Sequence, residues 1–422
     1  MYYRGHFRYS RKTLLYVLLT AGMLTACGQG QDESVGDGDH RKETEVVSEK
    51  DFAEEVKEDT EEIFKTDGAT ENVPEADEAV TTDGLSKADE AEEDALKQRF
   101  GANCISEQTF EVELSECDGK VWFVPYAPSG AEDFHMQIIQ DGEVLTDISG
   151  YVPEELKEQE FSSLDAVAFF DVNYDNMTDI VLIETYGDTS FAAFYYGRTY
   201  TGWGIPIVFS AQEQISDNIS GLVEPLTIPM IRSFLSNGKK NGEFTDYQEA
   251  YRAISRLSDL ETTGRWEYNL IYFDGDDIPE LVSGVRGYYI SLYTFHNGRI
   301  YTLMDCEAYG AGGNPGYEYV PGQNSMRNYN TDYAGLILGT TYSSISDQYT
   351  MDVDVEITTY NFDDANGNGR PDESEEASYG YCNISYIDGV EITADQYASY
   401  NVGEYEYIEP VMNLEELTTA LN

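Results

Sequence analysis

Three stretches of the sequence place oxygen-bearing side chains at alternate positions of a short loop. They begin at residues 171, 272 and 364 and are rich in Asp, Asn and Gly. Calcium is a hard cation that takes six to eight oxygen ligands. A tight loop turns the side chains at its first, third and fifth positions toward one centre, and a later carboxylate completes the set. The spacing therefore predicts calcium sites, with calcium as a structural cofactor.

The loop that begins at residue 364 has the most complete set of ligands. It reads DANGNGRPDESE and matches the EF-hand spacing, with Gly369 at the sharp turn and Glu375 at the closing position. Pro371 departs from the EF-hand pattern and no helix clearly flanks the loop, so it is more similar to the loops of dockerins and thrombospondin type-3 repeats. The predicted ligands are the side chains of Asp364, Asn366, Asn368, Asp372 and Glu375 and the main-chain carbonyl of Arg370.

The loop that begins at residue 171 resembles the FG-GAP or VCBS type. Residues 170–182 read FDVNYDNMTDIVL, which fits D-x-N-x-D-x-x-x-D followed by an apolar strand. Asn176 stands where a glycine is usual, and Asn adopts a positive φ more readily than most residues. The resemblance implies that the cation ligands are Asp171, Asn173, Asp175 and Asp179.

The loop that begins at residue 272 is an incomplete version of the same type. Residues 272–281 read YFDGDDIPEL, and when Glu280 is aligned as the ninth position the first ligand position falls on Tyr272. One carboxylate is therefore missing. Two readings stay open: weak cation binding through Asp274, Asp276 and Glu280, or a plain turn. The spacing between loops, about a hundred residues, is too long for the regular repeat of a propeller.

The first residues of the chain have the organisation of a secretory signal. A positively charged start is followed by a short apolar run, Leu14 to Leu24, and then by Leu-Thr-Ala-Cys. This resembles the bacterial lipobox, which implies that residues 1–26 are removed and Cys27 is lipidated. The apolar run is shorter than the span of about 20 residues that crosses a membrane. The resemblance predicts an exported protein, anchored to the cell membrane by two acyl chains.

Residues 27–100 are predicted to be an acidic, disordered tether. The segment is crowded with Asp and Glu and nearly lacks aromatic residues, so it cannot bury enough apolar surface to fold. The chain as a whole carries a formal charge of −55. Nucleic acid is excluded as a partner, because phosphate binding needs clustered Lys and Arg.

The remaining residues predict an α+β, predominantly β fold. Short alternating runs indicate antiparallel strands, with hairpin turns at Asp141-Gly142 and Asn297-Gly298. Helical spacing appears at 228–235 and 247–257, the second capped by Asp246, and at 414–421 behind Asn413. We expect two β-rich lobes, 101–225 and 226–422.

Cysteine and histidine are scarce in these lobes. Cys104 and Cys117 are close enough in sequence to bridge a hairpin, and Cys306 and Cys382 are the other possible pair, but the sequence does not choose among the connectivities. His135 and His296 are the only two of the four histidines that lie after the predicted tether, which excludes a His-rich metal centre there. We interpret His296 as a turn residue.

Motifs of enzymes are mostly absent. The sequence has no HExxH, G-x-S-x-G or phosphate loop. The prediction is a calcium-stabilised binding or adhesion module without catalytic activity. A carbohydrate-active hydrolase with paired carboxylates and a solute-binding lipoprotein of a transporter are the alternatives. The order of a helix, a strand, an acidic loop and a second strand over residues 247–281 also resembles a module of bacterial surface lipoproteins that have no assigned activity.

A glycan or a protein is the predicted ligand class. A Gly- and Tyr-rich stretch, residues 309–330, follows the strand predicted at 300–303. Its tyrosines are candidates to stack on sugar rings or to meet a protein partner, whereas the commoner role of such tyrosines is to lie on strand surfaces and in half-buried turns. The tyrosines concerned are Tyr309, Tyr317, Tyr319, Tyr329 and Tyr333.

Overall fold

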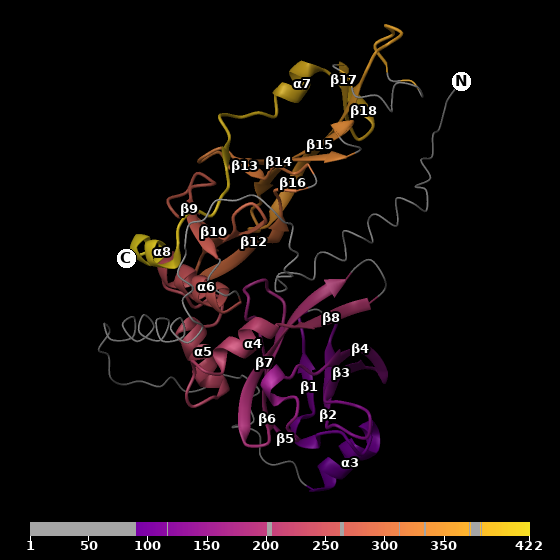
Figure 1. The fold of residues 1–422 in the computed structure, drawn as a ribbon, viewed down its shortest axis with the longest axis vertical. Coiled ribbons are helices and arrows are strands. Elements are labelled where there is room, and N and C mark those ends of the chain that lie inside the picture. The colour runs from indigo at the N-terminus through magenta and orange to yellow at the C-terminus, as the bar shows by residue number, and fades with distance from the viewer. Residues whose placement is uncertain are drawn as a thin grey trace, which may run out of the picture.

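In a computed structural model the protein consists mainly of antiparallel sheets, joined by a few helices (Figure 1). The structure describes residues 90–115, 117–200, 205–261, 266–311, 313–332, 335–370, 372, 380 and 382–422. The predicted signal peptide, Cys27, most of the predicted tether and Glu375 lie outside these residues. The expected fold class, α+β and predominantly antiparallel β, is confirmed.

Four sheets are built largely from strands that follow one another along the chain. The first contains β1 (Phe110–Glu113), β2 (Lys120–Tyr126), β3 (His135–Gln140) and β4 (Glu143–Ser149). The second contains β5 (Phe161–Phe170), β6 (Asp179–Tyr186), β7 (Thr189–Tyr200) and β8 (Ile205–Ala211). The third contains β9 (Glu267–Ile271), β10 (Glu280–Val285), β11 (Tyr289–His296) and β12 (Arg299–Ala308).

The fourth sheet has seven strands in the order β18-β17-β16-β15-β14-β13-β19. Its last strand along the chain, β19, pairs with its first, β13, so the chain returns to the edge where the sheet began. The strands are β13 (Tyr317–Tyr319), β14 (Met326–Asp332), β15 (Ile337–Ile345), β16 (Met351–Phe362), β17 (Cys382–Ile387), β18 (Val390–Ile392) and β19 (Glu406–Tyr407).

Both predicted hairpin turns are confirmed. Asp141 and Gly142 have φ of 52° and 86°, and Asn297 and Gly298 have φ of 51° and 80°. A type I′ turn needs a positive φ at both central residues, which Asn, Asp and Gly tolerate. These turns set the register of β3 with β4 and of β11 with β12.

The caps predicted at Asp246 and Asn413 are confirmed. The Oδ1 of Asp246 accepts a hydrogen bond from the backbone N of Glu249 at the start of α6 (Tyr247–Glu261), and Thr227, which was not among the predicted caps, caps α5 (Ile228–Ser236). Asn413 forms a capping box with Glu416 at α8 (Leu414–Ala420). The other helices are α3 (Glu90–Phe100), α4 (Glu213–Ile219) and α7 (Ala394–Ala398).

The sheets and helices form consecutive layers along an elongated molecule (Figure 1). One face of the second sheet packs on the first sheet, through residues such as Ile180 and Phe123. Its other face packs on α4, α5 and α6, which also cover the third sheet, so that Val181 and Leu281 belong to one core. The far face of the third sheet packs on the fourth. The predicted lobe boundary near 225 falls inside this shared helical core.

The chain's last described residues close the shared core. Backbone hydrogen bonds join Tyr268 of β9 to Met412 in both directions, at 2.7 and 2.8 Å. Beyond Met412, Leu417 and Leu421 are buried in the same core. The guanidinium of Arg252 on α6 donates to the carbonyl of Leu421 at 2.7 Å.

The predicted tether ends earlier than the sequence indicates. Residues 90–100, which were assigned to it, form helix α3. Its end is fixed to the first sheet because the Phe100 ring lies 5.4 Å from the Trp122 ring and the Arg99 guanidinium lies 4.7 Å from that same indole. Aromatic and cation–π contacts thus stabilise the junction. Within the described residues, no helix has the length and apolar character needed to span a membrane.

The structure does not form the cysteine pairs that the sequence left open. Cys104 and Cys382 are free cysteines, so neither the Cys104–Cys117 nor the Cys306–Cys382 bridge is present. The Cys104 thiol is buried and lies 3.1 Å from the Oγ1 of Thr109. Burial raises the pKa of this thiol, which makes it an inert core residue.

Candidate metal sites

The first acidic loop connects β5 to β6 and is shaped by hydrogen bonds from its own side chains. The Oδ2 of Asp171 accepts from the backbone N of Asn176 at 3.1 Å. Asn173 and Asp175 each accept from the backbone N two residues further on, at 3.3 and 2.8 Å. These bonds wind the backbone around the side chains at the first, third and fifth positions, as the cation-loop pattern predicts.

Asp179, at the ninth position, is fully buried and ties the loop to the sheet. Its Oδ2 accepts from the backbone N of Val172 at 2.6 Å, and its Oδ1 accepts from the backbone N of Gly197 on β7 at 3.0 Å. Only glycine fits at position 197, because a Cβ there would lie 2.3 Å from the carbonyl oxygen of Thr178. The carboxylate therefore has a structural role besides any cation binding.

The first loop contains a carboxylate oxygen that the protein leaves unsatisfied. The Oδ1 of Asp171 is buried and, among the described residues, accepts no hydrogen bond of ordinary geometry, although the side-chain amide of Asn241 and the backbone N of Tyr174 are close enough to lower the pKa of the carboxyl somewhat. Burial, assisted by the nearby charge of Asp175, raises the pKa of Asp171 to about 7. Burial also raises the pKa of Asp175, and that of Asp179 well above its ordinary value. A bound cation would supply the missing partner and favour the ionised carboxylates.

The second acidic loop, between β9 and β10, has the same backbone frame. Asp274 and Asp276 accept from the backbone N two residues further on, at 2.9 and 2.7 Å. Glu280 takes the place of Asp179: its Oε2 accepts from the backbone N of Phe273 at 2.8 Å, and its Oε1 from the hydroxyl of Thr294 on β11 at 3.1 Å. Burial raises the pKa of Glu280 to about 7.

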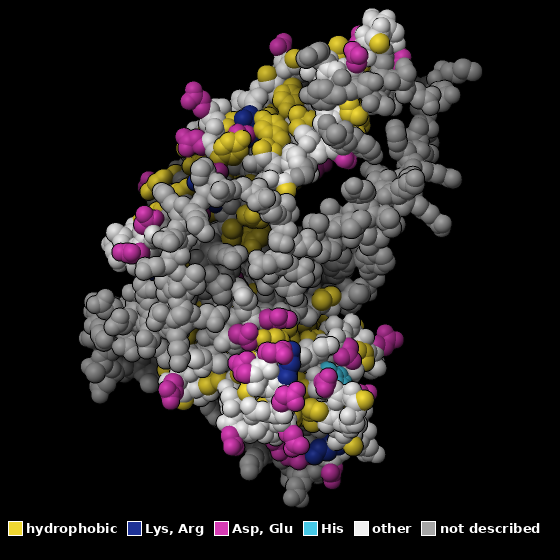
Figure 2. Space-filling view, viewed as in Figure 1, with side chains coloured by type: hydrophobic (Ala, Val, Ile, Leu, Met, Phe, Trp, Pro, Cys, Tyr) yellow, Lys and Arg dark blue, Asp and Glu magenta, His cyan; other side chains and the backbone are white. Residues whose placement is uncertain are grey.

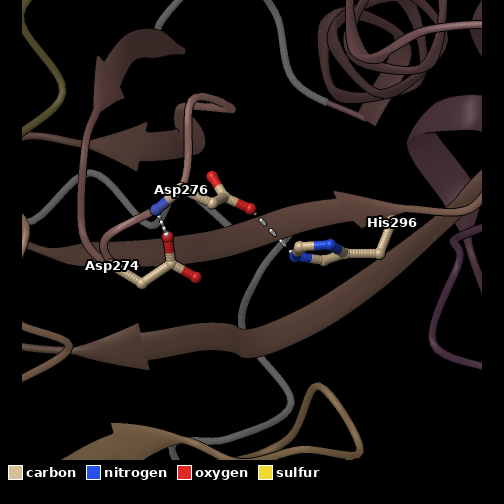
Figure 3. A group of neighbouring side chains, drawn as sticks. All are labelled: Asp274, Asp276 and His296. Carbon is tan, nitrogen blue, oxygen red and sulfur yellow. Dashed lines mark hydrogen bonds and ion pairs between the residues drawn. The ribbon is translucent and has the colours of Figure 1, made fainter.

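The second loop differs at its first position and gains a histidine instead. Tyr272 is 54% exposed and offers no carboxylate. His296, at the end of β11, points toward the loop, and its Nε2 lies 3.6 Å from the Oδ2 of Asp276 (Figure 3). One ligand atom each from Asp274, Asp276 and His296 lie within 4.8 Å of one another, the single such group of His, Cys, Asp and Glu among the described residues.

The predicted set Asp274, Asp276 and Glu280 is therefore not the set that the structure brings together. Glu280 is directed to the backbone and to β11, while His296 joins the two aspartates. The interpretation of His296 as a turn residue was right about its place next to the hairpin turn, but it missed this contact. The imidazole is stacked on the Tyr349 ring at 4.0 Å, which fixes its orientation. Sequence spacing does not indicate a contact that depends on how β11 lies against the β9–β10 loop.

The third loop, which follows β16, repeats the frame of the first. The Oδ2 of Asp364 accepts from the backbone N of Gly369, five residues on, at 3.0 Å. Asn366 and Asn368 accept from the backbone N two residues on, at 2.9 and 2.7 Å. The Oδ1 of Asp364 is buried without a hydrogen-bond partner in the part of the chain that the structure describes, like the Oδ1 of Asp171.

The closing part of the third loop is only partly described. The side-chain amide of Asn366 donates to the Oδ2 of Asp372 at 2.6 Å, which joins the third and ninth positions. The Arg370 guanidinium forms an ion pair with Glu391 of β18, which attaches the loop to the edge of the fourth sheet. Glu375, the predicted closing ligand, lies outside the described residues.

The predicted ligand-binding tyrosines are divided between core and surface. Tyr309 and Tyr319 are buried between the third and fourth sheets, so they are core residues. Tyr317 and Tyr329 are partly buried, the latter with the Arg327 guanidinium 5.1 Å from its ring centre, and Tyr333 lies outside the described residues. Hydrophobic side chains, tyrosines included, gather over the fourth sheet, whereas Asp and Glu are prominent over the first (Figure 2).

No protein-family model matches the chain, and no curated protein or solved structure matches it either.

Proposed function

We propose that the protein is a lipid-anchored surface protein in which calcium, bound by the first and third loops, stabilises the β-rich layers of a binding or adhesion module. The observation that carries the proposal is the pair of orphaned oxygens. In two loops far apart in the sequence, the first aspartate uses Oδ2 to cap an amide five residues on and leaves a buried Oδ1 without a partner.

A buried carboxylate oxygen without a partner costs free energy, of the order of 1–3 kcal/mol or more for a charged group. A hydrogen-bond donor placed next to the Oδ1 of Asp171 or of Asp364 would have removed this cost. Oxygen-only ligand sets suit calcium, whereas transition metals prefer sets that contain nitrogen or sulfur. Extracellular sites work with dissociation constants of about 10⁻⁴ to 10⁻³ M, which suits a protein outside the cell.

Support for the location comes from the sequence. The lipobox-like Leu-Thr-Ala-Cys at residues 24–27 and the acidic stretch that follows it are typical of a lipidated cysteine followed by a spacer. The test is membrane fractionation of the protein and of Cys27→Ser. We expect the parent protein in the membrane fraction and the variant in the soluble extracytoplasmic fraction. Equal partition of both would refute the anchor.

The calcium proposal is tested by thermal melts of the whole protein with calcium or with a chelator. Calcium at ten times the dissociation constant adds about 1.4 kcal/mol per site, which for two sites corresponds to a rise in Tm of roughly 5 °C. Asp171→Asn should remove part of this rise. Asp188→Asn is the matched control, since Asp188 is an exposed turn residue of the same sheet, between β6 and β7. An equal Tm with and without calcium would show that the loops are plain turns.

A further inference from the structure

A cavity of about 300 Å³ opens beside the first loop and is lined by an unusual concentration of basic side chains. It lies where the β5–β6 loop, α5 with its following turn, and the start of β12 meet. We refer to it as the basic cavity, after Arg232, Lys239, Lys240 and Arg299, which line it. Asp171 is the only acid among its lining residues.

This concentration stands out against the composition of the chain. The protein has 25 Lys and Arg and 80 Asp and Glu, so the charged residues that line a cavity are expected to be mostly acidic. A second cavity, of about 660 Å³ beside the first sheet, follows that expectation. Its described lining residues include Glu132, Asp133 and Asp147 and no lysine or arginine.

Among the described residues, neither of the two arginines of the basic cavity forms an ion pair, although the charge of Glu243 acts on Arg232 and opposes the effect of burial on its pKa. Lys239, in contrast, forms an ion pair, because its Nζ lies 2.5 Å from the Oε2 of Glu249. Among the described residues, Arg299 donates only to the amide oxygen of Asn176, at 3.2 Å. Surface arginines elsewhere do find acids, as Arg286 does with Glu409 at 2.6 Å.

Arg232 is held in place as a preformed binding group would be. Its guanidinium lies 4.1 Å from the centre of the Phe170 ring, and its Nε is buried without a hydrogen-bond partner. Burial lowers the pKa of this group, so the protein bears a cost in keeping it there. The ring contact holds the guanidinium beside the cavity, and a guanidinium binds planar, two-oxygen groups best.

We propose that the basic cavity binds a small molecule through an oxyanion group, a carboxylate or a sulfate, held between Arg232 and Arg299. Met177 and Leu235 supply an apolar wall for the remainder of the ligand. The volume is at the lower end of the range for ligand sites, so the ligand is of the size of one acidic sugar or amino acid.

Calcium and the oxyanion should bind cooperatively, and this part of the inference rests on the proposed function. Asp171 belongs both to the calcium loop and to the lining of the basic cavity. An ionised Asp171 repels the oxyanion, whereas a calcium ion on Asp171 removes that repulsion and adds attraction. Linkage then requires that the oxyanion strengthen calcium binding by the same factor.

The experiment is isothermal titration of the whole protein with sulfate, with glucuronate and with glucose, in chelator and in calcium. We expect sulfate and glucuronate to bind and glucose not to, because only the first two carry an oxyanion. Arg232→Met, which keeps the packing on Phe170, should weaken glucuronate binding roughly tenfold to a hundredfold. Arg299→Gln should act in the same direction. Arg286→Gln, which removes an arginine that does not line the basic cavity, is the matched control, and melting curves confirm that each variant folds.

Failure to bind either anion, or equal affinity for glucose and glucuronate, would overturn the inference. So would glucuronate binding that Arg232→Met and Arg299→Gln leave unchanged. If anions bind in chelator but calcium alters neither their affinity nor the Tm, the basic cavity stands and the proposed calcium function fails. If calcium raises the Tm and no anion binds, the proposed calcium function stands and the basic cavity is not an oxyanion site.

Discussion

The second and third sheets carry the same loop between their first two strands, yet the two loops offer a cation different ligands. In each, a ninth-position acid joins a loop amide to the third strand: Asp179 does so in one and Glu280 in the other. The difference lies at the first position, where Asp171 has an orphaned oxygen and Tyr272 has no carboxylate. The backbone frame of the loop therefore forms without a carboxylate at the first position.

The largest expected effect comes from removing the ninth-position acids. Asp179→Ala and Glu280→Ala should each lower the free energy of unfolding by about 3 kcal/mol, because each leaves buried hydrogen-bond donors without an acceptor. Urea denaturation in chelator measures this loss. The two variants should differ when calcium is added. Asp179→Ala should also remove part of the calcium-dependent stability, whereas Glu280→Ala should leave it unchanged. An equal calcium response in both variants would contradict the comparison.

The next effect is a dependence of stability on pH. The pKa of Asp171 and that of Glu280 are raised to about 7 from ordinary values of 3.8 and 4.5. Between about pH 4 and pH 7 the native protein therefore holds protons that the unfolded chain has released, so stability falls as the pH rises. We expect the Tm in chelator to be several degrees lower at pH 8 than at pH 5.

Calcium should offset this fall in the first loop only. Asp171→Asn, which cannot ionise, should flatten the pH dependence in chelator and abolish part of the calcium rescue at pH 8. Glu280→Gln should flatten it without changing the rescue. Buried Glu184 contributes the same trend in every variant, because burial raises its pKa as well. A Tm in chelator that rises from pH 5 to pH 8 would contradict the burial of these acids.

A smaller effect tests the missing carboxylate directly. Tyr272→Asp supplies the first-position acid in the second loop, and the exposure of Tyr272 means that little packing is lost. Calorimetry should detect one additional bound calcium ion per chain, at a dissociation constant of about 10⁻³ M. Tyr288→Asp, at a residue in the turn between β10 and β11 that is 66% exposed, is the control. An unchanged stoichiometry would mean that the first position is not what distinguishes the loops.

The smallest effect concerns the histidine of the second loop. A ligand set of two carboxylates and an imidazole suits zinc better than calcium. Zinc should therefore raise the Tm by a few degrees, and His296→Gln should remove that rise while the calcium response stays. His135→Gln controls for the other histidine of the folded part. A zinc response that survives in His296→Gln would assign the ion to other residues.

Local features of the fold could be predicted from the sequence, and contacts between distant segments could not. The turns at Asp141 and Asn297 and the caps at Asp246 and Asn413 follow from the preferences of single residues. Helix α3 was missed because its stability comes from Phe100 packing on Trp122, which local acidic composition does not reveal. The core that α4, α5 and α6 share with the second and third sheets was not predicted either, because it also depends on contacts between segments that lie far apart in the sequence.

The candidate sites divide in the same way. The frames around Asp171 and Asp364 follow from the spacing of Asp and Asn within each loop, since their hydrogen bonds span two or five residues. His296 and the basic cavity are products of tertiary packing, because their residues lie on separate elements. The one available signal was the contrast of Arg232 and Arg299 with an otherwise acidic chain.

The return of residues 412–421 to β9 and α6 has a consequence for the timing of folding. A polypeptide that emerges N-terminus first, from a ribosome or through a membrane pore, presents the second sheet, the helices and the third sheet well before the segment that seals them. Until Leu417 and Leu421 arrive, an apolar seam between α6 and β9 stays open to water and to other chains. The growing chain therefore passes through a stage in which this seam needs shielding, and that stage lasts until α8 has docked.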